Sequence, residues 1–294
     1  MTDSHVPLDD RASFGDRVAA AVASTGPLCV GIDPSAALLE RWGLDDDAGG
    51  LRTFGLRCVE ALAGIVPVIK PQVAFFERLG SAGMAALETV LAEAREAGLL
   101  VIADAKRGDM GSTMEAYASA WLDPASPLVA DAVTAAPYLG LGALQPMIDL
   151  AGAHGRGVVV VVRGSNPEGW TLQRSRTGDG AGPAVEDFLL GEIAAVNRGG
   201  RVPPGTVGAV VGATLAPSEF ALSGLGGVIL APGVGAQGAT AADVAALFAG
   251  CPPGGVLPSA SRSVLVAGPE VSALAGAARK AREEMAEAMD TVRS

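Results

Sequence analysis

The segment Leu99-Leu-Val-Ile-Ala-Asp-Ala-Lys-Arg-Gly-Asp109 joins a continuous apolar run to a cluster of charged residues. The apolar half has the length of a β-strand without polar alternation, which is typical of a strand buried on both faces of a parallel sheet. Residues 112–122, which follow, are rich in alanine and have helical spacing. This strand–loop–helix order predicts an α/β fold with charged side chains at the carboxyl end of the strand.

The same unit recurs along the whole chain of 294 residues. Strands are expected at 28–32, 66–70, 99–104, 132–136, 158–162, 207–212, 228–231 and 257–260. Helices are expected at 16–24, 53–64, 82–97, 112–122, 142–153, 183–198, 217–223 and 241–249, with an outer C-terminal helix at 269–292. Eight units predict that residues 1–294 form a single (β/α)₈ TIM barrel, with residues 1–12 as a flexible N-terminus. A doubly wound open sheet remains the alternative, because periodicity does not distinguish the two.

Composition excludes several classes of protein. The net charge of −11 argues against a nucleic-acid partner, which requires a broad basic surface. No apolar run approaches the roughly 20 residues of a membrane span, and the polar N-terminus does not resemble a secretory signal. Three widely spaced cysteines are typical of reduced, buried thiols in a cytoplasmic protein. The two histidines, His5 and His154, give little support to a histidine-bound metal or a Ser–His–Asp triad.

Polar residues follow six of the expected strands directly. Any one of them, such as Asp33 or Ser165, has an alternative role as a helix cap or turn residue. Because the carboxyl ends of barrel strands meet at one rim, where active sites of this fold are built, we expect the set to form one site. Its members are Asp33, Lys70, Asp104, Ser165, Gln237 and Arg262.

The motif Asp104-x-Lys106-x-x-Asp109 carries the strongest chemical signal. In an extended chain, residues two apart face the same side, so Asp104 and Lys106 are both expected to face the barrel axis. Lys70, on the neighbouring strand, is expected to join them. Such alternating charges form either a structural salt-bridge network or a lysine held protonated for proton donation.

The turn Pro232-Gly-Val-Gly-Ala-Gln237 predicts a phosphate site. Glycines allow backbone N–H groups to approach an anion, and the loops after strands seven and eight are the common phosphate site of these barrels. Arg262, after strand eight, is placed to form charge-assisted hydrogen bonds. A purely structural glycine turn is the alternative, whereas a Rossmann fingerprint fits poorly.

These residues together resemble the orotidine 5′-phosphate decarboxylase family, in its bacterial branch. The resemblance extends from Leu28 to about Val266, and its strongest part is Ile102-Ala-Asp-Ala-Lys-Arg-Gly-Asp-Met-Gly-Ser-Thr113. It implies decarboxylation of orotidine 5′-monophosphate (OMP) to UMP, the last step of de novo pyrimidine synthesis, without a metal or organic cofactor. It also implies a cytoplasmic homodimer with no membrane or nucleic-acid partner.

The resemblance also implies a role for each matching residue. Lys106 would donate a proton to C6 of the pyrimidine, Asp104 would lie near the departing carboxylate, and Asp109 would come from the partner subunit. The implied catalytic set is Lys106, Asp104, Lys70 and Asp109. The implied substrate-binding set is Asp33 for ribose, Ser165 for the pyrimidine, Thr113 near the shared site, and Pro232, Gly233, Gly235, Gln237 and Arg262 for phosphate.

Two rival functions remain open. Related barrels that act on sugar phosphates through a metal-stabilised enediolate share the Asp-x-Lys-x-x-Asp string but have an acidic residue in place of Lys70. A catalytically silent barrel that binds a nucleotide is the second rival. Residues 165–182, expected to lack regular elements, and residues 237–240 are the candidate lids. Arg107 and Arg163, beside the site, are expected to point outward into solvent.

Overall fold

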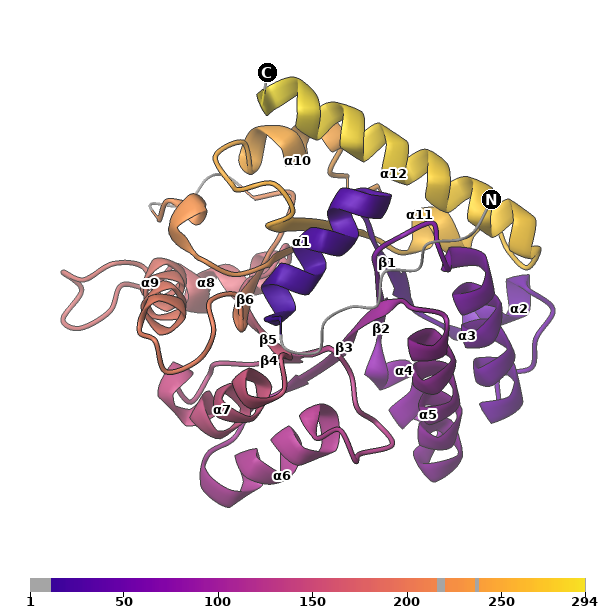
Figure 1. The fold of residues 1–294 in the computed structure, drawn as a ribbon, viewed down its shortest axis with the longest axis horizontal. Coiled ribbons are helices and arrows are strands. Elements are labelled where there is room, and N and C mark those ends of the chain that lie inside the picture. The colour runs from indigo at the N-terminus through magenta and orange to yellow at the C-terminus, as the bar shows by residue number, and fades with distance from the viewer. Residues whose placement is uncertain (1–11, 216–219, 236–237, 294) are drawn as a thin grey trace.

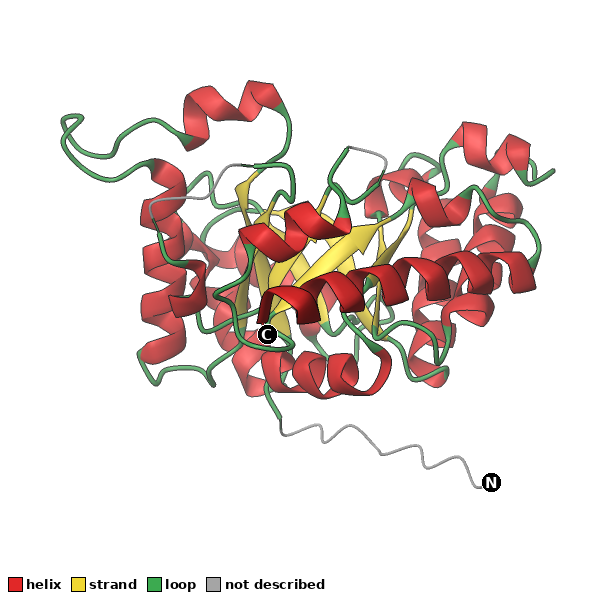
Figure 2. Cartoon of the chain, turned by 90° about the horizontal axis from the view of Figure 1, so that it is seen from above, coloured by secondary structure: helices red, strands yellow, loops and turns green. Residues whose placement is uncertain are grey.

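Eight parallel strands close into a barrel in the order β1 to β8, which confirms the expected fold and excludes the open sheet. The computed structural model describes residues 12–215, 220–235 and 238–293. Figure 2 shows the strands at the centre of the molecule with helices around them. The strands are β1 (Cys29–Ile32), β2 (Val68–Pro71), β3 (Leu100–Arg107), β4 (Ala132–Ala135), β5 (Gly157–Arg163), β6 (Val207–Val211), β7 (Ile229–Pro232) and β8 (Val256–Ala260).

The helices lie outside the strands, and most follow the expected ranges. The long ones are α1 (Phe14–Thr25), α3 (Ala48–Leu62), α5 (Gly80–Glu96), α6 (Gly111–Leu122), α7 (Gln145–Ala153), α9 (Val185–Arg198) and α12 (Val271–Arg293). Shorter ones are α2 (Ala36–Arg41), α4 (Val73–Glu77), α8 (Trp170–Gln173), α10 (Ala241–Leu247), α11 (Arg262–Leu265), and the 3₁₀ helices η1 (Leu141–Leu144), η2 (Pro167–Gly169) and η3 (Leu222–Gly224).

Two expectations about the helices were wrong. The segment 165–182 was expected to lack regular elements, but it contains η2 and α8. The described part of the helix expected at 217–223 is the 3₁₀ turn η3, while residues 216–219 lie outside the described residues.

The outer helix expected at 269–292 is α12, which runs past α10 and α11 in Figure 1. The N-terminal segment expected at 1–12 also lies almost wholly outside the described residues.

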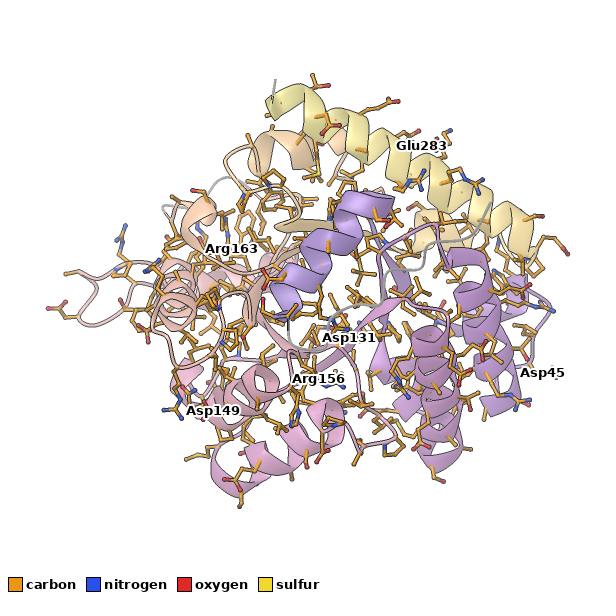
Figure 3. The ribbon with its side chains drawn as sticks, viewed as in Figure 1. Asp45, Asp131, Asp149, Arg156, Arg163 and Glu283 are labelled. Atoms are coloured by element: carbon orange, nitrogen blue, oxygen red, sulfur yellow. The ribbon has the colours of Figure 1, made fainter. Side chains whose placement is uncertain are left out.

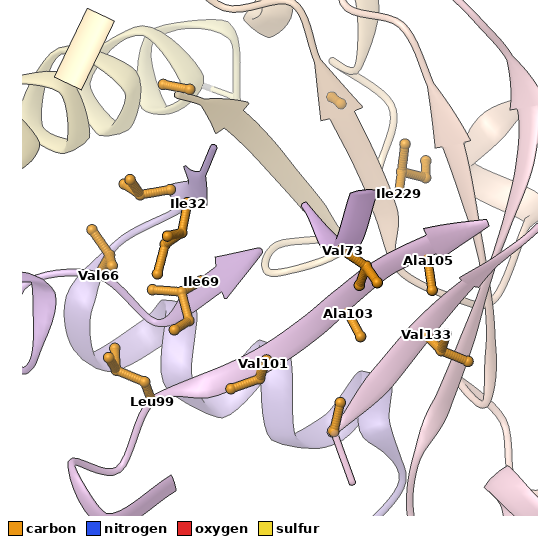
Figure 4. Packing of buried hydrophobic residues seen from close by; sticks show 14 of the residues in the cluster. Ile32, Val66, Ile69, Val73, Leu99, Val101, Ala103, Ala105, Val133 and Ile229 are labelled. Carbon is orange, nitrogen blue, oxygen red and sulfur yellow. The ribbon is translucent and has the colours of Figure 1, made fainter. Parts of the chain in front are cut away.

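Side chains of the strands alternate between two apolar layers. Val68, Leu100 and Val159 belong to a cluster inside the barrel. Their chain neighbours Ile69 and Val101 point outward into the larger cluster beneath the helices, part of which Figure 4 shows. This two-residue period explains why the strands read as continuous apolar runs, because both faces are buried.

Helix α1 closes the end of the barrel opposite the carboxyl ends of the strands, and Figure 1 shows it lying across the ring of strands. Phe14 is fully buried and packs into the inner cluster. A Cβ atom on Gly157 would lie 2.4 Å from the Phe14 ring, so the aromatic plug requires glycine there. Arg17 forms a buried ion pair with Asp131, whose other oxygen accepts a hydrogen bond from the Val101 amide at 2.8 Å.

None of the helices in the described ranges combines the length and the apolar character needed to cross a bilayer. The three cysteines, Cys29, Cys58 and Cys251, are buried. Burial raises the pKa of the Cys29 thiol to about 12.

We expect the substitution Phe14→Ala to lower the free energy of unfolding by about 3–5 kcal/mol, because it leaves a cavity at the bottom of the barrel. Urea denaturation followed by circular dichroism measures the change. Phe188→Ala is the matched control, because the Phe188 side chain on α9 is 45% exposed and its loss should change stability much less. Equal losses of stability in the two variants would contradict the role of Phe14 in filling the bottom of the barrel.

Candidate active site

Three charged side chains meet at the carboxyl ends of β2 and β3. The Asp104 carboxylate lies between two ammonium groups, with Lys70 Nζ 2.7 Å from Oδ2 and Lys106 Nζ 2.6 Å from Oδ1. The side chains of Lys70 and Asp104 are each 9% exposed, whereas that of Lys106 is 48% exposed. Lys106, which is accessible to solvent, is therefore held by the buried carboxylate of Asp104.

Two neutral donors, neither of which was predicted from the sequence, complete the shell around Asp104. Gln72 Nε2 donates to Oδ2 at 2.9 Å, and the Thr134 hydroxyl donates to Oδ1 at 2.9 Å. Each carboxylate oxygen thus accepts one charged and one neutral hydrogen bond, which accounts for about four acceptor sites of the group. A signal for Gln72 was present, because it stands two residues after Lys70.

The charges in the cluster stabilise one another. Burial alone would raise the pKa of Asp104, but Lys70 and Lys106 hold it well below its usual range. Burial lowers the pKa of Lys70, but the nearby carboxylates of Asp104 and Asp33 outweigh that effect and raise it to about 12. At neutral pH the cluster therefore contains an ionised aspartate and a protonated Lys70.

The backbone that presents Lys106 differs from the extended chain expected from the motif. Lys106 has φ of 49°, and it is the non-glycine residue with positive φ among those described. The register of β3 against β4 shifts between Ala103 and Arg107, which marks a bulge. Lys106 and Asp104 do meet, as expected, but through a bulge and a left-handed residue instead of regular alternation.

Asp109 lies apart from the three other charged residues of its own chain. Its carboxylate accepts a hydrogen bond from the Met110 amide at 2.8 Å. Within the described part of the chain, Asp109 forms no ion pair with Lys70 or Lys106. Met110 is 63% exposed, and Thr113, in the first turn of α6, is exposed as well.

Asp33 follows β1 and is tied to the segment after β8. Ser261 Oγ donates to Asp33 Oδ2, while Asp33 Oδ1 is buried with no hydrogen-bond partner in the described structure. A Cβ atom on Gly31 would lie 2.9 Å from Ser261 Cβ, so glycine is needed for this close approach. The bare oxygen therefore gives Asp33 unused acceptor capacity at this rim of the barrel.

The glycine turn after β7 lies against the start of α11. Gly235 has φ of 72°, and a Cβ atom there would lie 3.1 Å from Ser263. The Gly235 amide donates to Ala239 O at 2.9 Å, so in this conformation it serves the turn itself. Arg262 is the first residue of α11 and is exposed. Pro232 ends β7, Gly233 follows it with φ of 115°, and Gln237 lies outside the described residues.

Ser165 follows β5 at the same end of the barrel, beside Gly212 after β6. Arg163, labelled in Figure 3, was expected to point into solvent, and this was wrong. Its side chain is 6% exposed and forms an ion pair of 2.9 Å with Glu186, the second residue of α9. Burial raises the pKa of Glu186, and Arg163 offsets only part of that effect.

The Arg163–Glu186 pair joins the two ends of the excursion between β5 and α9. Within the excursion, Gln173 Oε1 accepts a hydrogen bond from the Gly164 amide at 3.1 Å. A cavity of about 160 Å³ lies beside Arg163 and Gln173, and Trp170 also lines it. The segment expected to be a lid therefore has a buried, charged base.

Arg107 lies on the helical side of β3, as expected, although it is only partly solvated. It pairs with Glu77 of α4, and its guanidinium lies 5.6 Å from the ring centroid of Tyr117 and 5.9 Å from that of Trp121, both on α6. Among the described residues, no group of three or more His, Cys, Asp or Glu side chains has the arrangement of a metal site.

The fold and the cluster define an α/β barrel with a charged centre at the carboxyl ends of its strands. The model of the orotidine 5′-phosphate decarboxylase / HUMPS family matches residues 26–277, and the chain belongs to this family.

Relatives that are named orotidine 5′-phosphate decarboxylase match the chain over most of their length. The chain is 56% identical over 266 residues to orotidine 5′-phosphate decarboxylase of Salinispora tropica, covering 90% of this chain and 94% of that one. It is 52% identical to the enzyme of Streptomyces coelicolor, again over 90% and 94% of the two chains. A crystal structure of a Streptomyces avermitilis protein assigned to the same activity has a TM-score of 0.90 and 49% identity, covering 98% of this chain and all of that one.

We expect Asp104→Asn to lower the free energy of unfolding by about 3–5 kcal/mol at pH 7, because it leaves two ammonium groups facing a neutral amide. Asp104 has a depressed pKa in the folded protein, so its contribution is present above the ordinary aspartate pKa of about 3.9 and is lost as the pH falls below it. The difference between wild type and variant should therefore narrow in acid.

Urea denaturation between pH 3 and pH 8 measures this difference. Asp46→Asn is the matched control, because it removes an exposed ion pair with Arg78 and should change stability far less. An Asp104→Asn variant as stable as the control variant would show that the buried cluster is not held by the carboxylate charge.

Proposed function

We propose that the chain decarboxylates orotidine 5′-monophosphate to UMP and CO₂. The observation that carries the proposal is the Lys70–Asp104–Lys106 cluster, which places a protonated amine and a carboxylate side by side at the mouth of the barrel. Relatives 52–56% identical to the chain are named for this activity and match nine tenths of it.

The cluster suits a reaction in which the bond between C6 and the carboxylate breaks and leaves its electron pair on C6. Lys106 Nζ then gives its proton to C6, and the released carboxylate departs as CO₂. Two negative charges about 4 Å apart repel by roughly 4 kcal/mol at an effective dielectric of 20, so Asp104 near the substrate carboxylate favours its loss. The ammonium of Lys106 stabilises the charge that develops on C6.

The remaining site residues suit the other parts of the nucleotide. Asp33, with its bare buried oxygen, is assigned to a ribose hydroxyl. Ser165, which follows β5 and lies beside Gly212, is assigned to the pyrimidine amide edge. Arg262 and the turn that contains Gly233, Gly235 and Gln237 are assigned to the phosphate, with Pro232 at the entry of the turn. Phosphate binding far from C6 supplies energy for closing the loops.

The proposal includes a homodimer in which Asp109 of one chain completes the cluster of the other. Asp109 is half-buried and lies away from Lys70 and Lys106 of its own chain, next to the exposed residues Met110 and Thr113. Tyr138, which is 80% exposed, and Leu139, which is 53% exposed, add apolar area after β4. Exposed apolar side chains together with a carboxylate that forms no ion pair with Lys70 or Lys106 of its own chain suit a symmetric interface between two copies.

The alternative of a metal-dependent enediolate reaction requires an acidic residue where this chain has Lys70. A protonated lysine 2.7 Å from Asp104 repels a divalent cation, which favours a reaction without metal or organic cofactor. The silent nucleotide-binding barrel would need no lysine beside the reacting carbon. We place the enzyme in the cytoplasm, in keeping with its three buried cysteines, with OMP and UMP as its small-molecule partners.

We expect wild-type protein to convert OMP to UMP in excess EDTA, and Lys106→Ala to lower kcat by about 10²–10⁴-fold because the proton donor is gone. Loss of substrate absorbance and formation of UMP measure the turnover, and calorimetry with UMP checks that the variant still binds product. Lys280→Ala is the matched control, since the Lys280 side chain on α12 is 79% exposed. Dependence on Mg²⁺ would favour the enediolate rival, and UMP binding without turnover would favour the silent barrel.

We also expect activity to return when inactive Asp109→Ala and inactive Lys106→Ala proteins are mixed. In a mixed dimer, one of the two sites regains both native residues, so random exchange restores about a quarter of the sites. Chains with different tags verify that subunits have exchanged. Exchange without recovery of activity would refute the sharing of Asp109 between subunits.

A further inference from the structure

The bulge in β3 sets three residues against one on β4. Ala103 pairs with Val133, and Arg107 pairs with Ala135. Between these pairs, residues 104–106 of β3 face Thr134 alone. One residue of β4 cannot form the ladder hydrogen bonds of three residues of β3. Backbone N–H groups in the bulge therefore need another acceptor.

The side chain of Thr134 supplies that acceptor. The amide of Lys106, the residue with left-handed φ of 49°, donates to Thr134 Oγ1 at 2.9 Å. For a residue with a Cβ atom this conformation is unfavourable by itself, and it persists where the surroundings hold it. The Thr134 hydroxyl oxygen holds it here by accepting the hydrogen bond from the Lys106 amide.

The same hydroxyl uses its single proton on Asp104 Oδ1, at 2.9 Å. That oxygen also accepts the hydrogen bond from Lys106 Nζ at 2.6 Å. A closed ring results, which runs from the Lys106 amide through the Thr134 hydroxyl and the Asp104 carboxylate to the Lys106 ammonium. Thr134 is 1% exposed, so it acts from behind the site.

We propose that Thr134 is a positioning residue, whose hydroxyl holds both ends of Lys106 and thereby sets the place of its ammonium group. The effect on turnover rests on the proposed function, whereas the effect on the backbone does not. A donor displaced by about 1 Å costs on the order of a hundredfold in rate, so fixing both ends of a flexible lysine matters for proton transfer.

Valine has nearly the shape of threonine but lacks the hydroxyl. In Thr134→Val the Lys106 amide loses its acceptor and Asp104 Oδ1 loses a donor, while the packing of β4 is retained. We expect kcat for OMP to fall about ten- to a hundredfold, the size expected for losing a hydrogen bond to a charged group. KM should stay within about threefold, because Thr134 lies behind the site and does not line it.

Two further variants separate positioning from packing. Thr134→Ser restores the hydroxyl, and we expect its kcat to return to within about threefold of wild type. Thr206→Val is the matched control, because Thr206 is also 1% exposed and its hydroxyl donates to Pro203 O at 2.7 Å, before β6 and away from the site. It should lose stability without losing kcat. If Thr134→Val does not fold, Thr134→Ala takes its place with the same expectations.

The backbone of Lys106 gives a readout that does not depend on activity. The crystal structure of each variant, or the Cα and Cβ chemical shifts of Lys106, should show left-handed φ in wild type and Thr134→Ser but not in Thr134→Val. An active wild type with an equally active Thr134→Val variant, or left-handed Lys106 in that variant, overturns the proposal. A wild type that does not turn over OMP refutes the proposed function, and the backbone readout still decides the role of Thr134.

Discussion

The site depends on one buried carboxylate that is fully engaged. Asp104 accepts two hydrogen bonds from ammonium groups and two from neutral side chains, and those donors come from β2, β3, β4 and the residue after β2. A buried charge is tolerated only when it is paired and hydrogen-bonded, so the strand ends must converge for Asp104 to stay ionised. The closed barrel provides that convergence, because parallel strands deliver neighbouring carboxyl ends to one rim.

The sequence predicted the strands well and the short helices poorly, for a physical reason. Strands buried on both faces leave long apolar runs, so the ranges expected for β1 to β8 differ from the observed ones by only a few residues. Helices such as α2, α4, α8 and α11 have four to six residues, too few to show a helical period. Such short helices form because the loops around them are fixed by tertiary contacts.

Within the site, the sequence located the charged residues and missed the neutral ones that hold them. Lys70, Asp104 and Lys106 stand out because charges after apolar runs are rare, whereas Thr134 reads as an ordinary strand residue. The bulge that makes Thr134 face residues 104–106 is a relation between two strands, and no single segment reveals it. Arg163 was misjudged for a similar reason, since its partner Glu186 lies across the whole β5–α9 excursion.

Charge balance connects this geometry to the ligand. One chain brings together the ammonium groups of Lys70 and Lys106 and the carboxylate of Asp104. These three groups together carry one excess positive charge. The Asp33 carboxylate, which also raises the pKa of Lys70, balances that excess. The cluster is therefore an alternation of opposite charges and not a positive patch, and the exposed Arg262 at the same rim adds one positive charge. An anion that enters the site meets Lys106 and Asp104 side by side, so the placement of its charged groups decides whether it is attracted or repelled.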